Sequence, residues 1–76
     1  DNTKILRTAI LKKASAVIVY HNHPSGSPTP GKADIKATES LKKALDLLEI
    51  SFLDHIIISD SRWYSFADEC VTEFGK

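Results

Sequence analysis

The stretch Ala16-Val17-Ile18-Val19-Tyr20-His21-Asn22-His23-Pro24 decides how this chain folds. Its first six residues form a continuous run rich in β-branched side chains, without polar alternation, which predicts a strand buried on both faces. Pro24 has no backbone N–H and cannot extend a hydrogen-bonded ladder, so the strand is expected to end just before it. We therefore place a buried strand at residues 16–21, with two histidines at its carboxyl end.

The segments on either side of this strand predict helices. Upstream, Asp1, Asn2 and Thr3 are helix-capping residue types, and the pattern that follows them is typical of an amphipathic helix of about three turns. Downstream, residues 22–31 contain three prolines and two glycines, a composition that excludes both helix and strand. An apolar stripe at helical spacing then predicts a second helix, and it comprises Ile35, Thr38, Leu41, Leu45 and Leu48.

The remainder of the chain predicts two more strands and a short helix. Residues 52–58 read as a second buried strand, residues 63–66 as a short third strand, and residues 67–74 as a weak closing helix. A strand, loop, helix and strand in this order imply a parallel pair with a right-handed crossover, and the last two strands then form an antiparallel hairpin. The expected fold class is α/β, with a small mixed β-sheet flanked by helices in one domain over residues 1–76.

Composition excludes several classes of function. The 76 residues carry ten basic and ten acidic side chains, so the formal net charge is zero and the pI is about 7.0. This balance lacks the basic field of a domain that binds nucleic acid, and no apolar run approaches the ~18 residues of a membrane span. The lone Cys70 excludes an internal disulfide and fits a reducing compartment. We expect a cytoplasmic protein without a nucleic-acid or membrane partner.

The sequence contains no methionine, not even at position 1. We therefore expect an N-terminally truncated chain, a fragment of a larger protein. Loss of upstream strands would leave an edge of the small sheet unprotected and apolar surface uncovered. The expected consequence is a homodimer, or a higher assembly, through that edge.

The end of the first strand carries the residues best suited to chemistry. His21 and His23 are two positions apart in an extended backbone, so their rings project to the same side. Asp34 follows in the first turn of the next helix, and two imidazoles with one carboxylate suit zinc. Three protein ligands and an open position for water are the pattern of catalytic zinc sites, in which the metal acidifies that water and polarises a carbonyl. The alternative is two half-exposed histidines at a turn and a carboxylate favoured by the helix dipole.

Three further residues are candidates for contacts around a metal or a substrate. Ser25 begins either a tight turn or a small backbone nest for an anion. Asp54 and His55 lie on opposite faces of the second strand, and one of them is a candidate to hydrogen-bond a metal-binding histidine. The alternative for both is an ordinary hydrogen-bonded strand position. The aromatic residues Trp63, Tyr64 and Phe66 either line a substrate groove or pack across the strands.

Four motifs in order resemble a known family. They are His21-Asn22-His23-Pro24-Ser25-Gly26, Pro28-Thr29-Pro30 with Asp34, Leu53-Asp54-His55-Ile56-Ile57-Ile58, and Tyr64-Ser65-Phe66. This chain is similar, over nearly its whole length, to the RadC family of JAB/MPN-type domains with the JAMM zinc metalloprotease motif. The resemblance implies a JAB/MPN-like, cytidine deaminase-like layered core and one zinc ion held by His21, His23 and Asp34. It also implies a bacterial zinc-dependent metallopeptidase or hydrolase that cleaves an amide or isopeptide bond of a peptide or protein substrate.

The sequence departs from the JAMM pattern at two places. The pattern has an upstream general-base Glu, then His-x-His-Pro, then a Ser three residues before the Asp. The Ser position is occupied by Gly31, and loss of one oxyanion donor commonly costs about 10²–10³ in rate. The first glutamate is Glu39, which follows the motif, so no catalytic residue is assigned within this chain and hydrolysis is expected only in the intact parent.

Two alternative functions stay open at this point. One is a catalytically inactive metal-binding or protein-interaction module, which the two departures favour. The other is a nucleic-acid-processing domain, suggested by the historical DNA-repair label of the RadC family. The neutral pI and the absence of a basic-aromatic stripe count against the second alternative.

Overall fold

The computed structural model describes residues 2–24 and 26–75. Two helices and four strands follow one another in the order α1 (Asn2–Leu11), β1 (Ala16–Asn22), α2 (Lys32–Leu47), β2 (Ser51–Ile58), β3 (Arg62–Ser65) and β4 (Cys70–Glu73). The strands form one sheet in the order β1-β2-β3-β4. β1 and β2 are parallel, while β3 is antiparallel to both β2 and β4. The α/β class and the parallel pair connected through a helix are thus confirmed.

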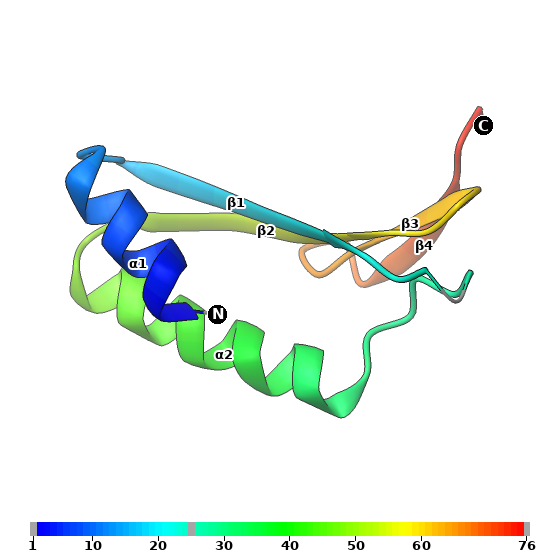
Figure 1. Ribbon diagram of the computed structural model, residues 1–76, viewed down its shortest axis with the longest axis horizontal. Coiled ribbons are helices and arrows are strands. Elements are labelled where there is room, and N and C mark those ends of the chain that lie inside the picture. The colour runs from blue at the N-terminus through cyan, green and yellow to red at the C-terminus, as the bar shows by residue number, and fades with distance from the viewer. Residues whose placement is uncertain (1, 25, 76) are drawn as a thin grey trace.

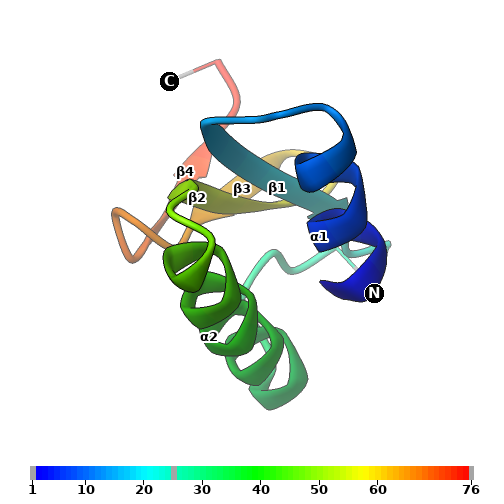
Figure 2. The ribbon, with the colours of Figure 1, turned by 90° about the vertical axis from the view of Figure 1, so that its left-hand side faces the viewer.

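Both helices lie on the same side of the sheet, as Figure 1 and Figure 2 show. The core between the two layers is built on Ala9, Leu41, Leu45 and Ile50. The predicted stripe of the second helix is buried at its centre, where Leu45 is 0% exposed, and is about half exposed at its ends, Ile35 and Leu48. No helix in the described part of the chain is both long and apolar enough to cross a membrane.

The prediction that the first strand is buried on both faces is wrong. Along β1 the side chains alternate between exposed and partly buried, and Ile18 and Tyr20 are 58% and 72% exposed. Val17 and Val19, on the other face, pack against the core. The cause is the one-sided helix layer, because an apolar run indicates a strand but does not show whether a second layer covers it.

The predicted closing helix at residues 67–74 is also wrong. Residues 66–69 form a turn, and β4 then pairs antiparallel with β3, so the sheet has four strands and not three. Val71 and Thr72 are β-branched and lie opposite Tyr64 and Trp63. Phe74 packs against the Trp63 ring with a centroid distance of 4.9 Å. These cross-strand contacts outweigh a weak helical pattern.

An irregularity in β2 changes which side chains face the helices. Val17 pairs with Phe52 and Ile18 pairs with Asp54, so Leu53 is an extra residue in the ladder. Strict alternation would put Phe52 and His55 on opposite faces of the sheet. With the extra residue, Phe52 packs against the core and His55 contacts Thr38 of α2. The bulge therefore turns His55 toward the helix layer.

Candidate metal centre

The three proposed ligands meet where β1 ends and α2 begins. His21 is the penultimate residue of β1, and the backbone of His23 continues the pairing by donating to the Ile58 carbonyl at 2.9 Å. The Nε2 atom of His21 is 3.3 Å from Oδ1 of Asp34, and the Nε2 atom of His23 is 3.3 Å from Oδ2 of Asp34. One potential ligand atom from each residue lies within 4.8 Å of the others. The structure thus brings together the three side chains that the sequence singled out.

Asp34 is held in place by the start of its own helix. The Gly31 amide donates to Oδ2 of Asp34 at 2.8 Å. Burial alone would raise the pKa of Asp34, but this hydrogen bond and the nearby imidazoles of His21, His23 and His55 lower the pKa below its ordinary value of 3.8. The carboxylate is therefore ionised at neutral pH.

The loop after β1 fixes the orientation of the His23 ring. Nδ1 of His23 lies 3.0 Å from the Ser27 carbonyl oxygen, which can only accept a hydrogen bond. In the neutral form of the ring, Nδ1 carries the proton and the lone pair of Nε2 faces Asp34. Pro28 is fully buried, and the Arg62 side chain donates to the Gly26 carbonyl at 3.3 Å, so the loop is tied to the body of the domain. Ser25, a sequence candidate, lies outside the described residues.

The donor set fits a divalent cation. In the neutral form of the His23 ring, its bare Nε2 atom and the ionised carboxylate are 3.3 Å apart and both carry negative partial charge. A cation between them removes this repulsion. The side chains of His21, His23 and Asp34 are 35%, 22% and 23% exposed, so the site is accessible to water. Within the described residues, the group that can hold a metal contains no glutamate.

Of the two candidates in β2, His55 adjoins the site and Asp54 does not. Nε2 of His55 is 2.8 Å from Nδ1 of His21, and Nδ1 of His55 is 2.6 Å from the Thr38 hydroxyl. His55 is 7% exposed, and its ring stacks on Phe66 at 4.7 Å. Burial, followed by the proximity of His21, lowers the pKa of His55 below its ordinary value of 6.5.

Asp54 serves the turn that follows β3. Its Oδ1 atom accepts from the amides of His55 and Ala67 at 2.7 and 2.9 Å, and its Oδ2 atom accepts from the Ser65 hydroxyl. Burial would raise the pKa of Asp54, but these hydrogen bonds lower it below 3.8. Asp54 therefore occupies an ordinary hydrogen-bonded strand position and does not contact a proposed metal ligand.

The aromatic residues of β3 and the turn after it pack within the sheet. Tyr64 meets Phe66 edge-on at 5.2 Å, and Phe66 in turn stacks on His55. Trp63 packs against Phe74. Packing between strands therefore describes these rings, and Phe66 also covers one face of the His55 ring.

Thr38 is the member of this cluster that the sequence analysis missed. Its place in the apolar stripe of the helix predicts a core residue, and it is 6% exposed. Its hydroxyl donates to the Asp34 carbonyl at 2.7 Å and also contacts His55. The sequence feature that could have identified Thr38 is its hydroxyl in an otherwise apolar stripe, four residues after the proposed ligand Asp34.

Two hollows of the surface lie on α2, and only one of them adjoins this cluster. One opens between α1, α2 and β1 directly beside the site, and its wall includes Val19, His21, Asp34, Thr38 and Leu41. It offers a partly apolar space next to the proposed ligands.

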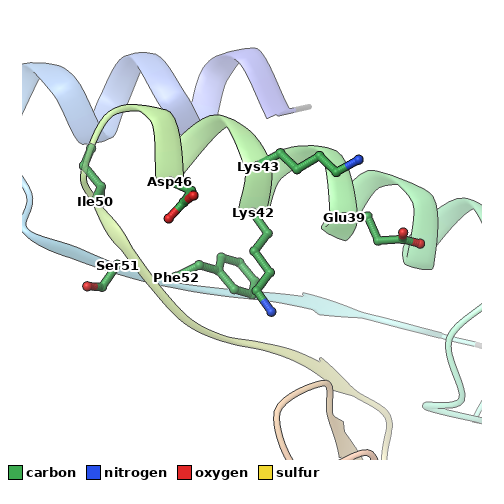
Figure 3. A pocket seen from close by; sticks show the side chains of 7 residues that line it. All are labelled: Glu39, Lys42, Lys43, Asp46, Ile50, Ser51 and Phe52. Atoms are coloured by element: carbon green, nitrogen blue, oxygen red, sulfur yellow. The ribbon is translucent and has the colours of Figure 1, made fainter.

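The other hollow, shown in Figure 3, lies between the later turns of α2 and the start of β2. Two lysines lie between two acidic side chains along its helical wall, and Lys42 extends beside Phe52. Its charged residues are Glu39, Lys42, Lys43 and Asp46. Because the charges are of mixed sign and lie on an exposed helix face, this groove is an ordinary solvated surface.

Comparison with known proteins gives one consistent result. A family model described as a RadC-like JAB domain matches residues 1–71. A UPF0758 protein of Thermotoga maritima is 52% identical over 65 residues, which cover 86% of this chain and 29% of that protein. UPF0758 proteins of Chlorobaculum tepidum and Aquifex aeolicus are each 46% identical, covering 90% and 88% of this chain and 31% and 29% of those proteins. The chain thus spans about three tenths of the length of the curated relatives it matches.

Proposed function

This chain belongs to the RadC-like JAB domain family, and from that premise we propose that it carries the zinc site of a hydrolase that cleaves amide or isopeptide bonds in the intact parent protein. The single observation that supports this proposal is the convergence of His21, His23 and Asp34 within 4.8 Å. The ionised Asp34 carboxylate and the Nε2 atom of His23, which is bare in the neutral ring, are both suited to a cation and support the proposal independently of the motif.

In this proposal the Nε2 atoms of His21 and His23 and a carboxylate oxygen of Asp34 hold the ion. A zinc ion bound there supplies a Lewis acid and acidifies a coordinated water. The chain's own groups orient the ligands: the Gly31 amide holds Asp34, and the Ser27 carbonyl holds His23. The partial exposure of all three side chains leaves an approach for water and for a substrate carbonyl.

Hydrolysis is assigned to the parent and metal binding to the chain itself. Gly31 has no hydroxyl to stabilise an oxyanion, and the described cluster includes no glutamate that could act as a general base. The chain alone therefore behaves as a metal-binding module with little hydrolytic activity. A cytoplasmic location and a peptide or protein substrate are part of the same proposal.

Zinc binding is tested first, on the 76-residue chain. We expect one zinc ion per chain, measured by competition with a chromogenic chelator, and loss of that site in His23→Ala and Asp34→Asn. Asp46→Asn is the matched control, because it makes the same change at an exposed carboxylate near the other end of α2. Zinc bound equally well by wild type, His23→Ala and Asp34→Asn would overturn the ligand assignment.

The reaction is tested on the intact parent protein. We expect cleavage of a peptide or isopeptide bond that stops with a chelator and returns with added zinc. The same assay with the His23→Ala parent should show no cleavage. Cleavage that continues undiminished in chelator, or in this variant, would contradict the proposal.

We also propose that the chain self-associates through β1. This strand is an outer strand of the sheet, and Ile18 and Tyr20 on its uncovered face are 58% and 72% exposed. Light scattering should show a concentration-dependent dimer that Tyr20→Lys weakens. A monomer at the highest accessible concentration would contradict it.

A further inference from the structure

We infer that His55 and Thr38 are positioning residues that fix the tautomer of His21, so that the Nε2 atom of His21 offers a lone pair to the metal. This inference rests on the proposed zinc site for its purpose. Its physical content is a hydrogen-bond relay that runs from the backbone of α2, through β2, to the end of β1. The relay exists in the chain before any metal binds.

The relay starts at the backbone carbonyl of Asp34. A carbonyl oxygen can only accept, so the Thr38 hydroxyl donates its one proton to it across 2.7 Å. The same hydroxyl lies 2.6 Å from Nδ1 of His55. Because its proton is already used, the Thr38 oxygen accepts in this second contact. Nδ1 of His55 therefore carries a proton.

The position of the proton on His55 in turn determines the tautomer of His21. The His55 ring is 7% exposed and stacks on Phe66, surroundings that disfavour a charged ring. A neutral ring with a proton on Nδ1 has a bare Nε2, which accepts from Nδ1 of His21 across 2.8 Å. With its proton on Nδ1, the neutral His21 ring has a bare Nε2, and this atom lies 3.3 Å from Oδ1 of Asp34.

The two histidine ligands thus reach the same state by different routes. His23 is set by one contact with a carbonyl four residues away in its own loop. His21 is set by a chain of two side chains that come from α2 and β2. Both bare Nε2 atoms face the same carboxylate, each opposite a different oxygen. Asp34 therefore contributes twice, through its side chain as a ligand and through its carbonyl as the anchor of the relay.

The fold supplies the geometry of the relay. The bulge at Leu53 turns His55 to the helix side of the sheet, where Thr38 and His21 lie. Phe66 lies nearly parallel to the His55 ring, at an interplanar angle of 10°, and limits its rotation. Hydrogen-bond partners behind a ligand orient it and tune its basicity, and their removal typically weakens metal affinity by about 10–100-fold.

Two pairs of variants test the relay in the 76-residue chain. Thr38→Val keeps the shape of the side chain and removes the hydroxyl, while Thr38→Ser keeps the hydroxyl. His55→Leu removes both contacts of the ring, while His55→Gln retains an acceptor in the direction of His21. Thr8→Val is the control for the first substitution, because it makes the same change at an exposed position of α1.

The first readout is the tautomer of His21 in metal-free protein. It is measured by two-bond ¹H–¹⁵N NMR at a pH where the ring is neutral. In wild type and Thr8→Val we expect the proton on Nδ1 of His21. Without the relay, Nε2–H can donate to Asp34, so Thr38→Val and His55→Leu should shift His21 toward the Nε2–H form. Thr38→Ser and His55→Gln should retain the wild-type form.

The second readout is the zinc dissociation constant from chelator competition. His55→Leu should weaken zinc binding by about 10–100-fold. Thr38→Val should weaken it less, and Thr38→Ser and Thr8→Val should match wild type. A His21 proton on Nε2 in wild type would overturn the relay, as would a folded Thr38→Val protein with an unchanged His21 tautomer.

The outcomes separate this inference from the proposed function. Wild-type protein that binds no zinc overturns the metal site, while the tautomer spectra still decide whether the relay exists. Zinc binding that His23→Ala abolishes but His55→Leu leaves unchanged supports the site and overturns the positioning role. If His55→Leu does not fold, Thr38→Val carries the test, because it leaves the stack of His55 on Phe66 in place.

Discussion

The inward-facing side chains at the two ends of α2 differ in character, because those at one end are apolar and those at the other are polar. Toward its C-terminus, Leu41 and Leu45 are buried in an apolar core. Toward its N-terminus, Asp34 and Thr38 face three histidines. The apolar end stabilises the fold by excluding water, whereas the polar end is stable only while each donor finds an acceptor. Among the described residues, no buried side-chain nitrogen or oxygen lacks a hydrogen-bond partner.

The largest expected effect belongs to the apolar end. Leu45→Ala should lower the free energy of unfolding by about 2–5 kcal/mol, because Leu45 is fully buried and the substitution leaves a cavity. Leu47→Ala on the same helix is the control, since Leu47 is 86% exposed, and its effect should stay within about 0.5 kcal/mol. Urea unfolding measures both. Equal effects of the two substitutions would show that the core is not where the structure places it.

Zinc should stabilise the polar end by a comparable amount. At a free zinc concentration 100 times the dissociation constant, the unfolding free energy should rise by about 2.7 kcal/mol. His23→Ala should remove this gain and change metal-free stability little, because His23 lies in a loop beside the site. Unfolding curves with zinc and with chelator provide the measurement. A gain that survives in His23→Ala would place the metal elsewhere.

Within β2, the neighbours Asp54 and His55 differ in the same way, because Asp54 stabilises a turn and His55 contacts a proposed metal ligand. Asp54→Asn should cost about 1–3 kcal/mol at neutral pH, because Asp54 accepts three hydrogen bonds. The folded-state pKa of Asp54 is lowered below 3.8, so this stability is present above pH 3.8 and is lost as the pH falls through the folded-state pKa.

Wild type and Asp54→Asn should therefore converge in stability under acid conditions, and urea unfolding above and below pH 3.8 measures the convergence. Because both proteins contain Asp34, the difference between their unfolding free energies removes its contribution. The pKa of Asp34 is lowered in the same direction as that of Asp54. A difference between them that is independent of pH would contradict the assigned role of the Asp54 carboxylate.

The smallest expected effect concerns the start of α2. Gly31 has φ −85° and ψ 174°, and a Cβ atom there would meet only Oδ2 of Asp34 at 3.6 Å. Gly31→Ser should therefore fit without strain and stabilise the helix by a few tenths of a kcal/mol, since serine caps a helix better than glycine. Gly31→Ala, which adds the Cβ without the hydroxyl, should not stabilise. Thermal unfolding of the three proteins distinguishes these outcomes, and a lower stability of the serine variant would contradict the cap geometry.

Much of the site was readable from local patterns. His21 and His23 are two residues apart at the carboxyl end of a strand, just before a proline, and Asp34 stands in the first turn of the following helix. The structure places these three side chains together at the carboxyl end of β1 and the first turn of α2. The prediction of a closing helix was wrong because it rested on local periodicity alone. Residues 70–73 form a strand because they pair with β3, and local periodicity does not report that pairing.

The amino-acid sequence by itself predicted the α/β class, because local periodicity distinguishes strand from helix. It also predicted the parallel pair and the three candidate ligands, because a strand, loop, helix and strand in this order imply a crossover that places them at one end of the sheet. Only the tertiary structure decided that helices cover one face of the sheet, that β2 carries an extra residue at Leu53, and that His55 instead of Asp54 contacts His21. These features arise from pairing between residues far apart in the chain. A one-residue change of strand register exchanges the two faces, and no local pattern records it.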